Sequence, residues 1–158
     1  MCVDPESFKN IMRRYPTGIT IVTAYLDRKP YGATVNSFTS VSLKPPLIGI
    51  FLGNNSRILK AVLESNGYCV NILNSAQSTL AERFAFKPGE ERFDHVKWFR
   101  NKSGFPVIDG SIAYLSTRIW RTYEIADHTL IVGEVIDADI LSDVKPLIYY
   151  MRGYREIC

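Results

Sequence analysis

The chain has 158 residues, which fits one domain spanning residues 1–158, and its 46% hydrophobic content is enough for a buried core. The net charge of +3 comes from scattered Lys and Arg without a run of like charges, which argues against nucleic-acid binding. No apolar stretch approaches the ~20 residues that span a bilayer and no signal peptide opens the chain, so we expect a cytoplasmic protein without membrane contact.

The first part of the chain predicts a helix followed by strands. Asp4 is a good N-cap, apolar residues then recur at helical spacing, and Pro16 ends the pattern. Alternating or apolar β-branched runs predict strands over 17–25, 31–42 and 47–52. Pro45 and Pro46 are expected to stop any regular element.

The remainder alternates less regularly. Periodicity predicts helices over 56–64, ended by Gly67, and over 75–85. Strands are predicted over 68–73, 112–125 and 129–140, a loop over 86–109, and a strand or turn over 147–151. Strands dominate and do not alternate with helices, so we expect a mainly β barrel with three short helices and not a parallel βαβ sheet.

The sequence offers no metal site and no common nucleotide-binding loop. Cys2, Cys69 and Cys158 form no CxxC pair, and His95 and His128 are 33 positions apart (128 − 95), which excludes an HExxH motif. A GxGxxG turn and a P-loop are also missing, which argues against a Rossmann dinucleotide site. Any bound nucleotide must therefore be held by another device.

Residues 32–42 are rich in small hydroxyl and amide side chains. Strand alternation places Thr34 and Asn36 on one face and Ser37 and Thr39 on the other, unless a bulge intervenes. Such side chains can approach a polar, flat heterocycle and its sugar chain. The alternative is a hydroxyl-rich edge strand whose Ser and Thr bond to the backbone.

Gly53–Arg57 lies between a predicted strand and a predicted helix. The free N–H groups of a helix start, the Ser56 hydroxyl and the Arg57 charge together make a plausible phosphate site. The alternative is that Asn55 or Ser56 merely caps the helix.

Three shorter segments carry weaker signals. Phe84 could lie against a ring or could pack in the core. His128, in a predicted turn, is a candidate hydrogen-bond donor to a substrate. The aromatics interleaved with Arg152 and Arg155 could hold a nucleotide by stacking and charge, or could be an ordinary C-terminal strand.

Five blocks in order give the chain a resemblance to a known family. They are YPTGITIVTA (15–24), GATVNSFTSVSLKPPLIGI (32–50), RFAFKPGEERF (83–93), DHTLIVGEV (127–135) and PLIYYMRGYR (146–155). Together they resemble the flavin reductase-like family, the FMN-binding split barrels that include the reductase components of two-component flavin monooxygenases. The resemblance covers most of the chain, although residues 53–56 depart from the charged pattern that family members often carry there.

The resemblance implies a Greek-key split β-barrel that works as a homodimer, with FMN or FAD as cofactor and NADH or NADPH as co-substrate. It places the flavin ring and ribityl chain against Ala33, Thr34, Val35, Asn36, Ser37, Thr39 and Ser40. It places the phosphate near Gly53, Asn54, Asn55, Ser56, Arg57, Phe84 and Ala85. It assigns the nicotinamide nucleotide to His128, Tyr150, Arg152, Gly153 and Tyr154, with His128 as the catalytic candidate.

By resemblance, the reaction is hydride transfer from a reduced nicotinamide to flavin, with reduced flavin supplied to a partner monooxygenase. The two cofactors carry the reactive atoms, so we expect stacking and N–H donors from the protein and no essential acid or base. Two alternatives stay open. The protein could retain FMN and pass electrons to another acceptor, or it could be a non-catalytic split barrel that binds flavin or haem.

Overall fold

The computed structural model describes residues 3–158, and strands dominate it, so the predicted mainly β class is confirmed. The helices are α1 (Pro5–Met12), α2 (Arg57–Glu64) and α3 (Ser78–Phe86), with 3₁₀ turns at Ser75–Gln77 and Gly89–Glu91. The strands are β1 (Thr17–Gly18), β2 (Thr20–Leu26), β3 (Lys29–Val35), β4 (Phe38–Leu43), β5 (Pro46–Gly53), β6 (Gly67–Ile72), β7 (Trp98–Arg100), β8 (Pro106–Ile108), β9 (Ala113–Ile125), β10 (His128–Ile140), β11 (Ile148–Tyr150) and β12 (Gly153–Arg155).

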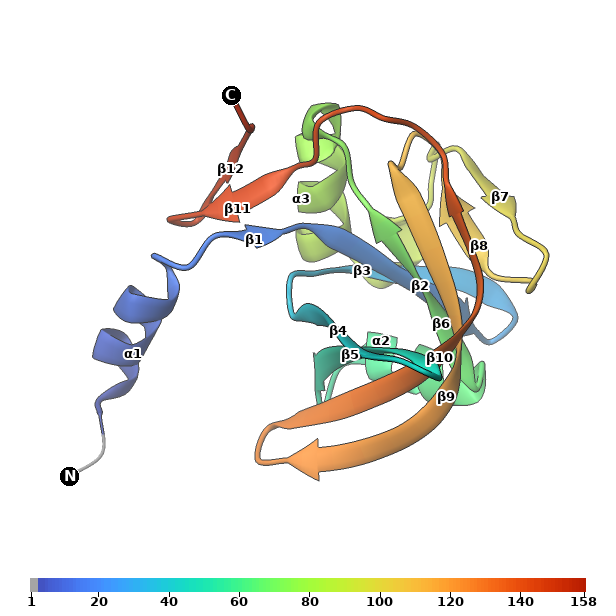
Figure 1. The fold of residues 1–158 in the computed structure, drawn as a ribbon, viewed down its shortest axis with the longest axis horizontal. Coiled ribbons are helices and arrows are strands. Elements are labelled where there is room, and N and C mark those ends of the chain that lie inside the picture. Colours follow the sequence, from blue (N-terminus) through green and yellow to red (C-terminus); the bar gives the residue numbers. More distant parts are fainter. Residues whose placement is uncertain (1–2) are drawn as a thin grey trace.

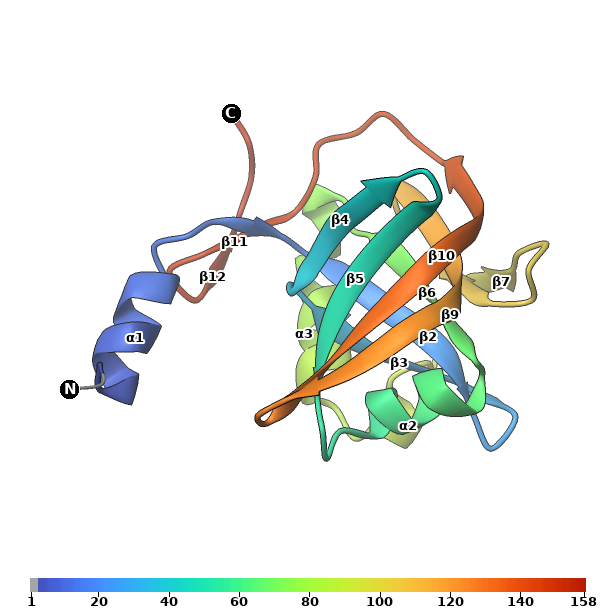
Figure 2. The same cartoon turned by 60° about the horizontal axis from the view of Figure 1, so that its bottom comes forward.

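Seven strands form one antiparallel sheet in the order β3-β2-β6-β9-β10-β5-β4. The sheet curls around a single core, because Val22 from β2, Val35 from β3, Ile50 from β5 and Ile131 from β10 all belong to one buried cluster. Figures 1 and 2 show this curvature, with α2 at one end of the enclosed space and α3 outside β2 and β3. The two edge strands, β3 and β4, are joined by only residues 36 and 37.

Helices α2 and α3 attach through their apolar faces. Ser56 caps α2 by accepting a hydrogen bond from the Leu59 N–H at 3.3 Å, as its sequence position predicts. The buried face of α2 joins the main core. Phe84 of α3 is fully buried in a second cluster, where its ring meets Phe93 edge-on at 5.0 Å.

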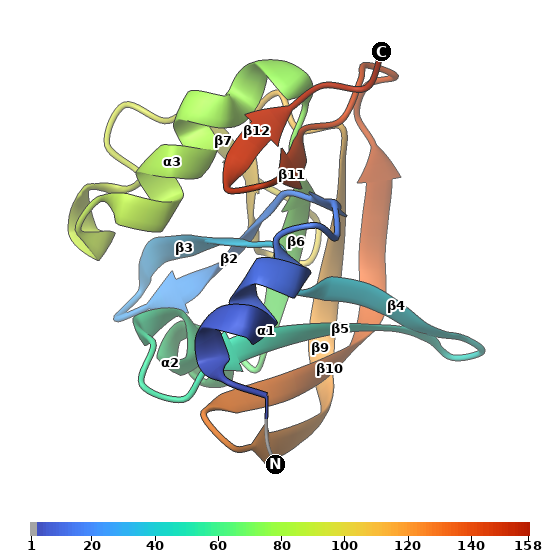
Figure 3. The same ribbon diagram turned by 90° about the vertical axis from the view of Figure 1, so that its left-hand side faces the viewer.

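The N-terminal helix forms as predicted but buries none of its residues. Asp4 caps α1 through the N–H groups of Glu6 and Ser7. Figure 1 shows α1 standing apart from the curled sheet, and Figure 3 looks onto the helix from that side. Its apolar residues Phe8 and Ile11 are exposed. The helix reaches the C-terminal hairpin through a hydrogen bond from the Met151 N–H to the Arg13 carbonyl at 3.1 Å.

Several predicted boundaries need correction. The strand predicted over 31–42 breaks at residues 36–37, where the Ser37 hydroxyl donates to the Phe51 carbonyl at 2.8 Å and accepts from its N–H at 3.3 Å. The prolines do interrupt the strand, since β4 ends at Leu43 and a turn at 44–45 precedes β5, although Pro46 itself is the first residue of β5 and pairs with Leu43. The predicted loop over 86–109 contains β7 and β8. Gly67 begins β6, and Asn66 takes the left-handed position after α2 with φ of 49°.

The cysteines behave as ordinary side chains where the structure describes them. Cys69 is a buried core residue, as predicted, and burial raises the pKa of its thiol to about 12. Cys158 is exposed and unpaired, and Cys2 lies outside the described residues. Within residues 3–158, no helix is long and apolar enough to cross a membrane.

Candidate functional site

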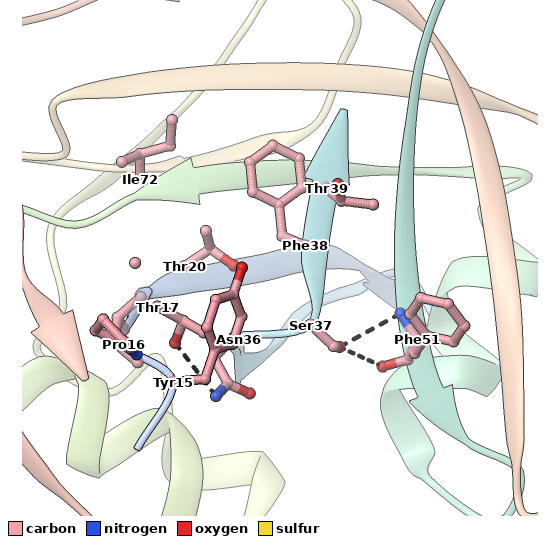
Figure 4. Close-up of a pocket in the computed structure, with 12 residues that line it drawn as sticks. Tyr15, Pro16, Thr17, Thr20, Asn36, Ser37, Phe38, Thr39, Phe51 and Ile72 are labelled. Atoms are coloured by element: carbon pink, nitrogen blue, oxygen red, sulfur yellow. Dashed lines mark hydrogen bonds between the residues drawn. The ribbon is translucent and has the colours of Figure 1, made fainter. Parts of the chain in front are cut away.

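A cleft of about 530 Å³ opens where the start of β2 meets the link between the two edge strands. Its size is that of a small-molecule site. Figure 4 shows the lining side chains, which come from residues 15–20, the 36–37 link, the start of β4, β5 and the end of β6. They are Tyr15, Pro16, Thr17, Gly18, Ile19, Thr20, Asn36, Ser37, Phe38, Thr39, Phe51 and Ile72.

Three of the polar residues predicted to meet the ring lie at this cleft. Asn36 is exposed there and its amide donates to the Thr17 hydroxyl at 3.4 Å. Thr39 is exposed and its hydroxyl donates to the Ser40 carbonyl at 3.2 Å, whereas the Ser37 hydroxyl hydrogen-bonds to the Phe51 backbone. Ser40 is exposed on β4 but does not line the cleft.

The other residues predicted to contact the ring, Ala33, Thr34 and Val35, have side chains that stabilise the fold. The Thr34 hydroxyl donates to the Ala81 carbonyl at 2.6 Å and so anchors α3 to β3. Val35 is 7% exposed and Ala33 packs against the same core. These three residues can therefore reach a ligand chiefly through their backbone.

That backbone has a free edge. β3 ends the order of the seven-stranded sheet, so no strand within residues 3–158 pairs with its side away from β2. Along it, the Gly32 carbonyl accepts from the Arg92 guanidinium at 2.8 Å. Unpaired strand N–H groups are strong, fixed donors, and a flat ring with polar edges can pair with them as another strand would. This edge runs up to Asn36, which lines the cleft, so the polar backbone of β3 leads to a cleft whose walls are largely apolar.

The predicted phosphate turn and His128 are neighbours. Gly53 is the cross-strand partner of His128. Asn54 ties the two turns together, since its amide donates to the Ala126 carbonyl at 2.9 Å and accepts from the Thr129 hydroxyl at 2.8 Å. Its side chain is therefore engaged in holding the β9–β10 turn, while Asn55 is exposed.

His128 is held by its neighbour in this turn. Its Nδ1 lies 2.8 Å from the Asp127 carboxylate, and this hydrogen bond lowers the pKa of Asp127. The His128 side chain is half exposed, so the ring remains accessible. With Nδ1 engaged, its Nε2 is the nitrogen left for a ligand.

Arg57 begins α2 and forms an ion pair with Glu90. Its guanidinium also lies over the Tyr31 ring, 5.4 Å from the ring centroid. The pairing raises the pKa of Arg57 and lowers that of Glu90. Tyr31 and Asn36 are five residues apart on the chain, about 17 Å along an extended strand, so Arg57 lies toward the far end of β3 from the cleft.

The Phe84 side chain packs in the core, which is one of the two alternatives that the sequence left open. The residue is fully buried, and a Cβ on Gly32 would approach its ring to 2.8 Å, so the ring supports β3 from behind. Ala85 beside it is half-buried. The contribution of this segment is to position the strand.

The C-terminal segment lies beside a second cavity of about 300 Å³. Arg152 lines this second cavity together with residues of α1. Tyr15, Thr17 and Asn36 line both the second cavity and the main cleft, so the two spaces adjoin. Tyr150 is exposed, Gly153 begins β12, and the Tyr154 ring packs 5.8 Å from Tyr149. Residues 15–20 line the cleft without having been predicted as site residues. The only signal in the sequence was that they form the first of the five blocks.

No metal centre is visible between residues 3 and 158, where no three His, Cys, Asp or Glu side chains gather. A cleft with aromatic walls and hydroxyl and amide groups, next to a free backbone edge that leads toward the Arg57 guanidinium, matches a planar, anionic organic ligand. It has no strongly placed acid or base in the cleft, so chemistry there must come largely from the molecules it binds.

The sequence profile described as "Flavin reductase like domain" matches residues 12–158. A flavin reductase (NADH) of Kitasatospora aureofaciens is 36% identical over 96% of this chain and 81% of its own length. The reductase subunit HsaB of a flavin-dependent monooxygenase from Mycobacterium tuberculosis is 32% identical over 98% of this chain and 83% of its own. The structure of Streptomyces globisporus NADH:FAD oxidoreductase SgcE6 with NAD and FAD fragments covers 100% of this chain and 97% of its own, with 33% identity and a TM-score of 0.91. The chain therefore belongs to the flavin reductase-like family.

Proposed function

We propose that this protein transfers hydride from NADH or NADPH to FMN or FAD and supplies the reduced flavin to a partner monooxygenase. The observation that carries the proposal is the cleft between the start of β2 and the link from β3 to β4, with the free edge of β3 beside it. The protein is an NAD(P)H-dependent flavin reductase, as its curated relatives are. The monooxygenase partner is inferred from relatives that are reductase subunits of such enzymes.

The cleft fits a flavin on its own features. Phe38 and Phe51 line the cleft and supply flat apolar surface, and the free edge of β3, which leads to Asn36, offers backbone N–H donors at alternate residues for the polar side of a ring. A bound flavin supplies the hydride acceptor, and a reduced nicotinamide supplies the hydride. N–H donors aimed at the ring stabilise the negative charge that grows there on reduction. Asn36 and Thr39 fix the position of the ring edge, and Arg57 holds the phosphate.

The nicotinamide nucleotide is assigned to the space around His128 and the β11–β12 hairpin. His128 neither gives nor takes a proton in the hydride-transfer step. With Nδ1–H donated to Asp127, the neutral ring accepts a hydrogen bond from the carboxamide N–H through Nε2 and so orients the carboxamide. Tyr150, Arg152, Gly153 and Tyr154 offer aromatic surface and a cation beside the cavity that adjoins the cleft. The role of this arrangement is to bring two rings together at about 3–3.5 Å.

The active form is a homodimer of split β-barrels. The curled seven-stranded sheet with separate edges supports the split barrel. The outer face of the sheet supports the dimer, because Phe51 and Tyr123, which flank Leu130 of β10, are exposed, as is Ile125. A second copy seated on this face covers apolar surface that a single chain leaves in water. We place the enzyme in the cytoplasm, where unpaired thiols stay reduced.

NADH and NADPH oxidation, measured with and without added FMN or FAD, tests the function. Turnover that rises with free flavin supports the proposal, and the absence of turnover with every flavin indicates a carrier. His128→Ala is expected to raise the apparent KM for NADH about 2- to 30-fold, since one hydrogen bond to a ligand is worth roughly 0.5–2 kcal/mol. Its Kd for FMN should stay at the wild-type value. A collapse of flavin affinity, or an unchanged KM, contradicts this role.

A further inference from the structure

Arg57, to which we assigned the flavin phosphate, already forms an ion pair with a carboxylate of the protein. Glu90, on the 3₁₀ turn Gly89–Glu91, accepts a hydrogen bond from Arg57 Nη1. The two residues are 33 positions apart in sequence, so the fold and not the local chain brings them together. Both side chains are more than half exposed, at 53% and 64%, so a ligand from solvent can compete for the same donors.

The fold holds Glu90 at this place. Arg83 of α3 donates to the carbonyls of Arg92 and Asp94, each at 2.9 Å, and also binds the Glu91 carbonyl, which ties the loop after α3 to the helix. A Cβ on Gly89 would run into the Tyr31 ring, so the turn lies directly on that ring. The carboxylate is thus delivered to Arg57 by an anchored turn.

A second guanidinium lies near but is used differently. Arg92 is 5.6 Å from the centroid of the same Tyr31 ring. Its donors go to backbone carbonyls, Nε to Lys87 at 2.9 Å and Nη1 to Gly32 at 2.8 Å. Arg92 therefore has a structural role, because it holds backbone carbonyls in place. The hydrogen bond from Arg57 to a side-chain carboxylate can instead be exchanged for one to a phosphate.

We propose that Glu90 competes with the flavin phosphate for Arg57 and that this internal competition weakens flavin binding, which favours release of the reduced flavin. The inference rests on the proposed function. Binding of a phosphate requires Arg57 to leave Glu90, and the displaced carboxylate then lies close to a like charge. Both effects weaken affinity for a phosphorylated flavin and leave riboflavin, which has no phosphate, unaffected. Weaker binding favours faster dissociation of the reduced flavin, which a protein that delivers this flavin to another enzyme requires.

The test compares the Kd values of FMN and riboflavin for the wild type and Glu90→Gln by fluorescence titration of the full chain. Exposed ion pairs of this kind correspond to at most about a fivefold change in an equilibrium constant. We expect Glu90→Gln to bind FMN about two- to fivefold more tightly and riboflavin as the wild type does. The gain should shrink in high salt, because exposed charges are screened.

Two variants separate competition from general repulsion. Glu91→Gln removes the adjacent carboxylate, which lies 4.0 Å from Lys87, and should leave the Kd of FMN unchanged. In an Arg57→Gln background, Glu90→Gln should give no gain, because nothing is left to compete for. An unchanged Kd of FMN in Glu90→Gln, an equal gain for riboflavin, or a gain that persists without Arg57 overturns the inference while both flavins still bind. Failure of the wild type to bind either flavin overturns the proposed function as well.

Discussion

Replacing Gly18 by tryptophan is expected to weaken FMN binding at least about tenfold, a change of ~1.4 kcal/mol. Gly18 lines the cleft and is exposed, and a Cβ built on it meets nothing within 4 Å. Its φ lies outside the left-handed region, so a side chain fits without backbone strain. An indole placed there fills the space that the isoalloxazine ring needs.

The measurement is a fluorescence titration of FMN, with the apparent KM for flavin in NADH oxidation as a second readout. Lys29→Trp is the matched control, since Lys29 is exposed at the opposite end of the β2–β3 hairpin. Both variants should unfold at the wild-type temperature, because neither substitution meets a packed neighbour. If Gly18→Trp binds FMN as tightly as Lys29→Trp does, the flavin does not occupy this cleft.

Gly67→Ala is expected to destabilise the protein by about 3 kcal/mol. Gly67 is buried at the start of β6 and pairs with Arg118 of β9. A Cβ at this position would collide with the Thr117 carbonyl oxygen and lie 2.9 Å from the Phe105 ring. Backbone cannot move aside without breaking the β6–β9 pairing, so the strain must appear as lost stability.

Urea unfolding at fixed protein concentration measures this loss, with the slope of the transition checked for two-state behaviour. Gly53→Ala serves as the control, because its Cβ meets nothing within 4 Å, and its stability should stay within about 0.5 kcal/mol of the wild type. Equal stability of the two variants would show that the barrel wall is not packed as described.

Most of the elements could be predicted because their signals are local. The alternating runs of β9 and β10 and the capped pattern of α2 appear within a residue or two of their predicted bounds. The break at residues 36–37 could not be predicted, since it depends on Ser37 meeting Phe51, fourteen residues further on. β7 and β8 were missed because three-residue strands carry almost no periodicity.

The sequence indicates which segments of the chain belong to the candidate site, but not which of their side chains are free to contact a ligand. The five blocks identify the family, but which hydroxyls remain free is decided by tertiary hydrogen bonds, such as that of Thr34 to Ala81. The aromatic ring of Phe84 could have faced a ligand or the core, and only the packing against Gly32 and Phe93 decides for the core. Glu90 gave no signal at all, because its partner Arg57 is brought near by the fold.

A crystal structure of the protein with FMN bound is the most direct test of the flavin site. The predicted result is an isoalloxazine ring in the cleft beside Asn36 and Thr39, with its polar edge toward the backbone of β3, its phosphate at Arg57, and a second copy covering the outer face near Phe51. A flavin bound elsewhere, with Asn36 and Thr39 facing no ligand, would contradict the account.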